Sequence, residues 1–403
     1  MLKHAISINY FFAFSVYGIA IPFLSIILHD KGLNDAQVNL VMGANGLAVI
    51  LAPMFVSYFA DRHLSVRRLQ CLLALGVSAV VPFLHIVHST SSGFFVTLAF
   101  FSLMVPNLSN LDAFTVHYAK QAVPQGAKQR GFQNYRLWGS IGFTVPGLCL
   151  LPLSWWMDIS ADLLIQIATL AAFLSVCSAL GLPDDKPAEA QNRSLPSTDA
   201  IRLALKPPLF GLFASTIVAG LALSQFYIAY PRYLQELSYS NTAISLIINL
   251  GVFWEILLMP FTQKLIARFG ARKLVMLAIL SIPLRLFLVV VWPTPTMIIA
   301  TQILHAPLVI GLFITIPIFL GEIAGPSFKF SMQSLNTTLV FGVSRLLGPL
   351  IAAGLLQLTA LEGFGAQRAL LILSSCLGLL AFVVLILSAE GKVENHSHYK
   401  GIV

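Results

Sequence analysis

The chain has 403 residues, of which 57% are hydrophobic and only 10% are charged, and its mean hydropathy is +0.85. Such a small number of polar residues cannot cover a water-soluble domain of this size, so the composition excludes a soluble globular protein and indicates that lipid is the main solvent. The net charge of +8 is large enough to suggest nucleic-acid binding. Its placement along the chain instead makes it a signal of membrane topology, and no nucleic-acid partner is expected.

Apolar runs of about 20 residues, the length that crosses a bilayer, divide the chain. In the first half they predict spans near residues 5–28, 37–60, 69–89, 93–117, 135–153 and 160–182. In the second half they predict spans near 208–232, 241–266, 273–292, 296–321, 331–357 and 367–389. The predicted fold class is an all-α membrane protein with twelve transmembrane helices in two pseudo-symmetric bundles of six.

A short phrase occurs once in each half of the chain. Ala60-Asp61-Arg62-His63 follows the second predicted span, and Ala267-Arg268-Phe269-Gly270 follows the eighth. The offset of 206 residues that pairs Arg62 with Arg268 also pairs Asn34 with Ser240. Duplicated bundles are typical of secondary transporters. The predicted division is an N-terminal bundle at 1–182, a polar, Pro-rich linker at 183–207, and a C-terminal bundle with a short tail at 208–403.

The Lys and Arg residues are unevenly distributed between the two sides of the predicted membrane. Eighteen of the 24 fall on the side that holds both termini and the linker, and three fall on the other side. The positive-inside rule therefore predicts cytoplasmic termini in a bacterial inner (plasma) membrane. The first apolar run is long enough to span and no cleavage pattern follows it, so we interpret it as helix one rather than as a signal peptide.

Signals of enzymatic chemistry are weak. The four cysteines fall in apolar spans, where we expect small buried hydrophobic residues and no disulfide: Cys71, Cys149, Cys177 and Cys376. His85 and His88 share a helix face but lack a nearby third ligand, so no metal and no other cofactor is expected. No nucleotide-binding loop or hydrolase motif is present, which argues against an enzyme and against an ATP-driven pump.

The plan of two halves with a basic Asp-Arg loop resembles the major facilitator superfamily over essentially the whole chain. Ser57 and Leu64 stand where glycines are common in that loop, and Ala267 replaces the acid in the second copy. The resemblance implies a gating role for the loop residues, which are Asp61, Arg62, Arg268 and Arg272. The missing second acid makes the two copies unequal.

Four further motifs narrow the resemblance. They are Tyr135-Arg136-Leu137-Trp138-Gly139-Ser140-Ile141-Gly142-Phe143, Gln302-Ile303-Leu304-His305, Phe253-Trp254-Glu255-Ile256, and Gly32-Leu33-Asn34 followed by Gln37. Together they are similar to the branch that contains lactose permease, the phenylpropionate permeases and the nucleoside:proton symporters. That branch implies a proton-coupled transporter for a sugar, a nucleoside or an aromatic acid.

Charged residues within predicted spans are the strongest candidates for the site, because an ionised group in the bilayer is costly and usually faces a cavity. The guanidinium of Arg136 could hold a carboxylate or vicinal hydroxyls, or it could snorkel to the membrane surface. The resemblance implies contact with substrate. Glu255 is the one carboxylate placed deep in a span, where burial disfavours its charge and suits it to carry a proton. The alternative is a permanent structural partner for an arginine.

Two further ionisable residues accompany Glu255. His305 is either a hydrogen-bonded spacer or, as the resemblance implies, part of a proton and substrate network. Arg285 is expected to pair with Glu255. Leu308 stands where lactose permease has an acid, so Glu255 is the better candidate for proton coupling.

Uncharged polar side chains within the spans form a second tier of candidates for substrate binding, each of which could instead join helices by hydrogen bonds. They are Tyr10, Tyr17, Asn45, Gln225, Tyr227, Gln302, Gln333 and Asn336. Asp112 is a weaker candidate that lines or caps the cytoplasmic end of helix four. Trp138 and Phe143 could stack on a ring or simply pack, and Arg345 has no assigned role.

These observations predict a monomeric secondary transporter that moves a small polar organic solute in symport with a proton by alternating access. Arg136 would hold the solute from the first half, and Glu255 and His305 would hold it from the second. A neutral, polyol-like solute suits one Arg and one Glu better than a strong anion. Two alternatives stay open: a proton-coupled exporter of hydrophobic compounds, and a non-transporting membrane sensor.

Overall fold

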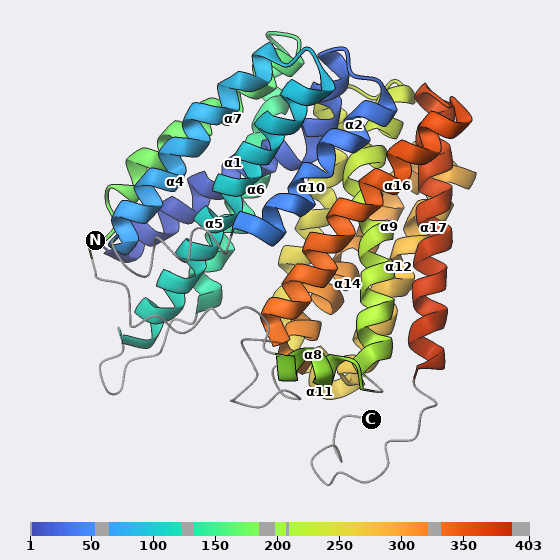
Figure 1. The fold of residues 1–403 in the computed structure, drawn as a ribbon. Coiled ribbons are helices and arrows are strands. Elements are labelled where there is room, and N and C mark those ends of the chain that lie inside the picture. The colour runs from blue at the N-terminus through green and yellow to red at the C-terminus, as the bar shows by residue number, and fades with distance from the viewer. Residues whose placement is uncertain are drawn as a thin grey trace, which may run out of the picture. The chain divides into compact units, whose positions relative to one another are not determined.

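The computed structural model describes residues 2–52, 64–121, 132–184, 198–206, 209–320 and 332–388, and every regular element in these ranges is a helix (Figure 1). Twelve helical segments are long and apolar enough to cross a membrane. They are His4–Asp30, Asp35–Ala52, Val66–Ile86, Thr90–Asp112, Asn134–Leu153, Ala161–Ala179, Leu209–Glu236, Asn241–Phe269, Ala271–Val291, Pro295–Leu320, Met332–Thr359 and Gly363–Leu387. The predicted all-α, twelve-span fold is confirmed.

The chain divides into two compact units. Unit 1 comprises Met1–Asn192 with Ser238–Leu246, and unit 2 comprises Arg193–Leu237 with Ile247–Val403. The described elements of unit 1 are α1 (Leu2–Asp30), α2 (Asp35–Met42), α4 (Val66–Val80), η1 (Val81–Ile86), α5 (Thr90–Gln121), α6 (Phe132–Leu153) and α7 (Ala161–Ala179).

The second half of the chain is more interrupted. Its described elements are α8 (Thr198–Ala204), α9 (Leu209–Glu236), α10 (Asn241–Leu258), η2 (Met259–Phe261), α11 (Thr262–Phe269), α12 (Ala271–Val291), α13 (Pro295–Ala300), η3 (Thr301–Leu304), α14 (His305–Val309), η4 (Ile310–Thr315), η5 (Thr337–Val343), α16 (Ser344–Thr359) and α17 (Gly363–Leu387). Two of these, η4 and η5, are π-helices, which are rare and often occur at functional sites.

The repeat seen in the sequence reappears in the backbone of two turns. Gly32 ends α1 with a φ of 93°, and Asn34 then caps α2 by a reciprocal pair of hydrogen bonds with Gln37. At the offset of 206 residues, Ser238 also has a positive φ, of 65°, and the Ser240 hydroxyl accepts from the Ala243 amide. The two halves therefore share a turn geometry as well as a motif.

Glycines bring α1 and α6 into backbone contact. A Cβ atom added to Gly142 would lie 2.1 Å from the Phe11 carbonyl oxygen, and one added to Gly18 would lie 2.0 Å from the Phe143 carbonyl oxygen. Small residues are the usual means by which membrane helices approach closely, because lipid offers no hydrophobic drive to association. This approach fixes the position of the middle of α6 against α1.

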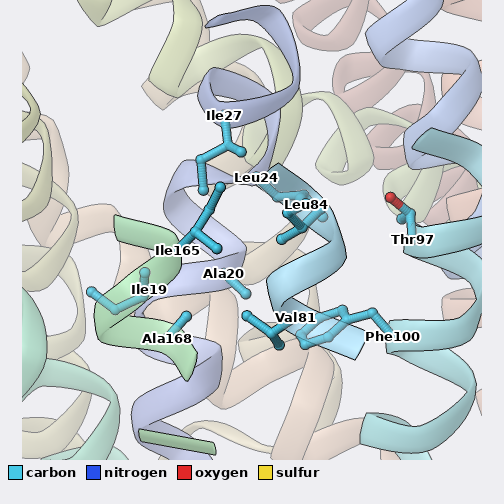
Figure 2. A pocket seen from close by; sticks show the side chains of 10 residues that line it. All are labelled: Ile19, Ala20, Leu24, Ile27, Val81, Leu84, Thr97, Phe100, Ile165 and Ala168. Atoms are coloured by element: carbon cyan, nitrogen blue, oxygen red, sulfur yellow. The ribbon is translucent and has the colours of Figure 1, made fainter. Parts of the chain in front are cut away.

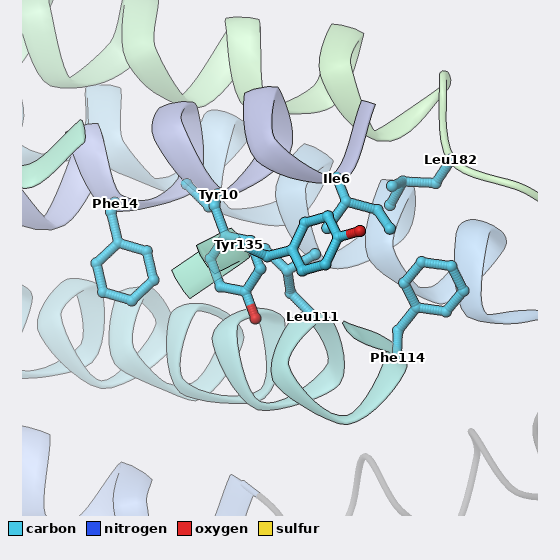
Figure 3. Packing of buried hydrophobic residues seen from close by; sticks show 8 residues of the cluster. Ile6, Tyr10, Phe14, Leu111, Phe114, Tyr135 and Leu182 are labelled. Carbon is cyan, nitrogen blue, oxygen red and sulfur yellow. The ribbon is translucent and has the colours of Figure 1, made fainter. Parts of the chain in front are cut away.

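Buried side chains fill the space between α1 and α5. Figure 3 shows this cluster, which contains Ile6, Tyr10, Ala13, Phe14, Leu111, Phe114, Tyr135 and Leu182. Tyr10 is fully buried within it although its hydroxyl is polar. The cluster therefore holds a polar atom in the apolar interior of unit 1, where it requires a partner.

A network of amide side chains joins four helices of unit 1. Gln70 on α4 donates to the side-chain oxygens of Asn9 and Asn107 and accepts from Asn110 at 2.9 Å. Asn9 in turn donates to the Ser175 carbonyl at 3.2 Å. Asn9, Gln70 and Asn107 are at most 1% exposed. Paired in this way, they hold α1, α4, α5 and α7 together in a medium where unpaired polar groups are costly.

The expected burial of the cysteines is wrong for three of the four. Cys71 is half-buried, but Cys149, Cys177 and Cys376 are exposed on the helix surfaces, and all four are free thiols. A helix face that meets lipid is as apolar in sequence as one that meets protein, so hydropathy alone cannot separate the two environments.

The contact at Gly142 gives a stability prediction. We expect Gly142→Ala to destabilise the protein by about 1–3 kcal/mol, because the added methyl meets a backbone carbonyl that can yield only if the two helices separate. The thermal midpoint of the purified protein in detergent, followed by tryptophan fluorescence, measures the change.

Gly354→Ala is the matched control, since Gly354 lies in α16 with no described heavy atom within 4 Å of its added Cβ. Alanine is a better helix former than glycine by about 1 kcal/mol, so this variant should be as stable as the parent or slightly more stable. Equal midpoints for the two variants would contradict the close packing of α1 on α6.

Candidate functional site

In unit 1, Arg136 lies near the start of α6 beside an acid from α5. Its Nε atom is 3.8 Å from Asp112 Oδ1, and the Tyr10 hydroxyl donates to the same oxygen at 2.7 Å. The guanidinium stacks over the Phe14 ring at 4.0 Å from the ring centre. The sequence analysis treated Asp112 as a weaker candidate. The pairing could have been inferred from the sequence, because Asp112 lies late in one span, Arg136 lies early in the next, and one loop joins the two spans.

The Arg136 cluster, which comprises Arg136, Asp112, Tyr10 and Phe14, is held on one side and open on the other. The side chains of Arg136 and Asp112 are 35% and 40% exposed, so the guanidinium has N–H groups left for a ligand. Gly139 leaves the room that this stacking needs, because a Cβ there would lie 2.8 Å from both Arg136 Nη1 and the Phe14 ring. The cluster is suited to bind an oxygen-rich group through directed N–H donors.

In unit 2, Arg285 on α12 is almost completely buried, with 2% of its surface exposed. Its Nη1 atom lies 3.2 Å from His305 Nδ1, its Nη2 atom donates to Gln302 Oε1, and its guanidinium lies 4.2 Å from the centre of the Phe226 ring. Gln302 also donates to the Tyr230 hydroxyl and to the Ile298 carbonyl, both at 2.9 Å. These contacts fix Arg285 rigidly inside the unit.

His305 connects Arg285 to Glu255. An arginine can only donate hydrogen bonds, so His305 Nδ1 accepts from Arg285 and the ring proton resides on Nε2. That nitrogen lies 3.7 Å from Glu255 Oε2. Glu255 and His305 side chains are 16% and 9% exposed. The expected proximity of Glu255 and Arg285 is thus realised through His305, and the three residues form a continuous chain of ionisable groups, here called the Arg285–Glu255 chain.

The second-tier candidates occupy varied surroundings. Gln225 is 3% exposed, and neither polar atom of its side chain has a hydrogen-bond partner among the described residues; Asn45 Oδ1 is likewise buried and unpaired there. Tyr227 is half-buried, Tyr17 packs edge-on against Phe101, and Gln333 donates to the Pro317 carbonyl. Asn336 is buried, and its Oδ1 atom has no partner in the described ranges.

Of the predicted gating residues, Arg268 is exposed and Arg272 half-exposed, whereas Asp61 and Arg62 lie outside the described residues.

The remaining motif residues have structural surroundings. Trp138 is 44% exposed, and Phe143 packs on the cluster around Tyr10. His85 Nδ1 and Lys31 Nζ lie 2.8 and 2.7 Å from the same oxygen of Asp162, which ties α1, η1 and α7 together. In the part of the chain that the structure describes, no group of three His, Cys, Asp or Glu residues could hold a metal ion.

Each unit has a small pocket among its described residues. The first, in unit 1, is bounded by α1, η1, α5 and α7, and Figure 2 shows that apart from the Thr97 hydroxyl its lining is entirely apolar. A single hydroxyl offers little to orient a polar solute. The second, in unit 2, is lined by polar as well as apolar side chains, including Ser224, Tyr227, Phe341 and Arg345. Sequence reasoning gave Arg345 no role and did not predict this pocket.

Comparison with known proteins agrees with this architecture. Residues 4–364 match the MFS_1 like family. The chain is 26% identical to the "Putative nucleoside transporter YegT" of Escherichia coli (strain K12), over 64% of this chain and 60% of that protein, so it spans less than two thirds of that relative. It is 24% identical to the "Probable 3-phenylpropionic acid transporter" of the same organism, over 74% of this chain and 77% of that protein.

Solved structures show the same fold. The nucleoside transporter NupG superposes with a TM-score of 0.83 at 18% identity, and the match covers 97% of this chain and 100% of that one. A peptide transporter of the POT type superposes with a TM-score of 0.70 at 13% identity, covering 96% of this chain and 94% of its own. The predicted resemblance to the major facilitator superfamily is confirmed, and the chain belongs to the MFS_1 like family.

Proposed function

We propose that this protein imports a small polar organic solute together with a proton across the bacterial inner membrane, with both termini in the cytoplasm. The observation that carries the proposal is the Arg285–Glu255 chain, because ionisable groups inside an apolar bundle are costly to bury and usually mark the path of a solute or a proton. The names of the relatives support a nucleoside or an aromatic acid as the solute.

In this proposal unit 1 binds the solute and unit 2 carries the proton. Arg136, oriented by Asp112 and Phe14, binds the solute from unit 1 through its open N–H groups. In unit 2, Glu255 takes up and releases the coupled proton, and His305 transmits the change to Arg285. Because Arg285 is held by Gln302 and by an aromatic ring, a change at Glu255 is met by movement of the histidine rather than of the arginine.

Alternating access completes the cycle. Two bundles joined by a polar linker can rock so that one central site opens to each side of the membrane in turn. In this scheme Asp61, Arg62, Arg268 and Arg272 act as gating residues on the cytoplasmic side. The protein works as a monomer in this scheme, since a single chain contains both bundles.

Removing the Glu255 carboxylate should separate proton coupling from solute binding. In proteoliposomes, we expect solute-driven alkalinisation of the outside medium for the parent protein and none for Glu255→Gln, because an amide cannot carry a proton. Equilibrium exchange of labelled solute should persist in the variant, since exchange needs no net proton movement. The screen covers uridine, sugars and 3-phenylpropionate, and a pH-sensitive dye and a filter assay give the two readings.

Glu362→Gln is the matched control, because Glu362 is an exposed carboxylate with no capping hydrogen bond at the start of α17. It should behave as the parent. If Glu255→Gln still showed solute-driven alkalinisation, Glu255 would not be the residue that carries the coupled proton. Flux without any proton movement would indicate a uniporter, binding without flux would indicate a sensor, and accumulation of hydrophobic compounds in acidified everted vesicles would indicate an exporter.

Asp112 should act on solute affinity through Arg136. We expect Asp112→Asn to weaken solute binding about tenfold, or roughly 1.4 kcal/mol, because the guanidinium loses the charge that orients it. The thermal midpoint should change little, since an ion pair this exposed contributes at most about 1 kcal/mol to stability. Isothermal titration of the purified protein measures the affinity.

Asp162→Asn provides the comparison for this variant, since Asp162 is also paired with a cation in unit 1 but ties the ends of α1 and η1 together. It should leave solute affinity unchanged. If both variants bound solute as the parent does, Arg136 would not depend on Asp112.

A further inference from the structure

Four basic residues of unit 2 lie on either side of Gly270, where α11 meets α12 (Figure 1). Lys264 and Arg268 belong to α11, and Arg272 and Lys273 belong to the first turn of α12. Gly270 is the one residue between the two helices, and its positive φ of 83° allows the chain to change direction there. The four residues are called the basic corner below.

The basic corner has no acid to balance its charge. Residues 256–321 contain no Asp or Glu. In the part of the chain that the structure describes, none of the four cations forms an ion pair with an acid. Cations of unit 1 do find acids, as Lys31 does with Asp162 and Arg68 with Asp184. The corner is therefore a local excess of positive charge within the protein.

The helices themselves add to the cost of this charge. Lys264 and Arg268 are like charges at positions i and i+4 of one helix, which repel each other. Arg272 and Lys273 occupy the first turn of α12, where the helix dipole disfavours cations. This is also the copy of the repeated phrase in which Ala267 replaces the acid. An anion held at the corner would relieve both penalties.

The length of the eighth span places α11 at the level of the lipid headgroups. The span Asn241–Phe269 has 29 residues and is roughly 43 Å long, whereas the hydrocarbon core of a bilayer is about 30 Å thick. The segments α10 and η2, which precede α11, already make up about the thickness of that core. The basic corner consequently lies where phosphate groups are the most abundant anions.

Exposed aromatic rings accompany the cations of α11. Lys264 Nζ lies 6.0 Å from the centre of the Phe261 ring, and the Arg268 guanidinium lies 5.4 Å from that of the Phe269 ring. Both rings are about half exposed. A helix with exposed apolar side chains beside cations is typical of segments that lie in the membrane interface.

An exposed apolar stripe on α12 leads away from the corner into the span. Lys273 is exposed, and Leu277, Leu284 and Phe287 follow it at helical spacing on the same side of α12. These three large apolar side chains are exposed, whereas their neighbours Ile279 and Leu286 are buried. The stripe thus offers an apolar surface that begins directly below a cation.

We propose that the basic corner binds the phosphate of an anionic phospholipid, with an acyl chain of that lipid along the stripe of α12. Arginine forks and lysine ammonium groups are the usual donors to phosphate. Free phosphate would meet the same cations but would leave the rings and the stripe without a new contact, so the surface favours a lipid. The ligand is distinct from the transported solute, and the inference goes beyond the proposed function.

The first experiment measures the thermal midpoint of the unmodified protein in a neutral detergent as lipid is added. We expect phosphatidylglycerol to raise the midpoint in a saturable manner and phosphatidylcholine to raise it much less, because a ligand of the folded state stabilises it. High salt should weaken the effect of phosphatidylglycerol, since the cations are exposed. Equal effects of the two lipids, or an equal effect of glycerol 3-phosphate, would overturn the proposal.

Substitution of two lysines assigns the effect to the basic corner. For Lys264→Gln combined with Lys273→Gln, the concentration of phosphatidylglycerol that gives half of the stabilisation should rise by roughly tenfold or more. The lipid-free midpoint should stay near that of the parent, because both lysines are exposed. Lys264→Arg combined with Lys273→Arg keeps the charges and should respond to the lipid as the parent does.

Arg67→Gln combined with Arg68→Gln is the matched control. It also removes two cations, and the offset of 206 residues pairs Arg67 with Lys273. This variant should keep the parent's dependence on phosphatidylglycerol. An equal loss in the two double glutamine variants would indicate attraction to any basic surface, and no loss in the lysine variant would place the lipid elsewhere; either result would refute the assignment. The readout needs no transported solute, so it is independent of the proposed transport function.

Discussion

The cost of holding a positive charge within an apolar span governs the interior of this protein. Three arginines that the sequence places inside spans each stack on an aromatic ring: Arg136 on Phe14 at 4.0 Å, Arg285 on Phe226 at 4.2 Å and Arg345 on Phe341 at 5.5 Å. The face of an aromatic ring attracts a cation and is at the same time compatible with an apolar bundle. The three arginines differ in their second partner. Arg136 has a carboxylate, and Arg285 has a histidine and an amide side chain. For Arg345, the stacking on Phe341 is the contact that the described residues show.

Those contacts depend on how closely the helices approach. At Gly18 and Gly142 in unit 1, and at Gly220 and Gly348 in unit 2, the packing leaves no room for a Cβ atom. In each unit the glycines join the first spanning helix to the helix that carries a half-buried arginine, α6 or α16. Backbone contact at these points sets the depth and direction of the arginine, so the site geometry follows from the placement of small residues.

The sequence was sufficient for the architecture and for choosing the main candidate residues. Twelve spans follow from hydropathy, and Arg136, Glu255, His305 and Arg285 follow from the rarity of charge in spans. The sequence did not predict which of these side chains touch one another. Asp112 and Arg136 lie on consecutive helices, and His305 comes to lie between Arg285 and Glu255 only when three helices pack together. The stacking of Arg345 on Phe341 was not predicted either, because the π-helix η5 lies directly before Ser344 and changes which side chains face one another.

The contrast between Arg285 and Arg136 supports the separate roles proposed for them. Arg285 is 2% exposed and makes hydrogen bonds to two side chains, so a solute that reached it would have to break contacts that nothing else would satisfy. The Arg136 side chain is 35% exposed beside Asp112, so a ligand there adds hydrogen bonds to N–H groups that the described contacts leave open. Rigid attachment suits Arg285 to respond to Glu255 through His305, whereas the open side of Arg136 suits it to bind an oxygen-rich group. Proton and solute then act on different arginines, one in each unit of the chain.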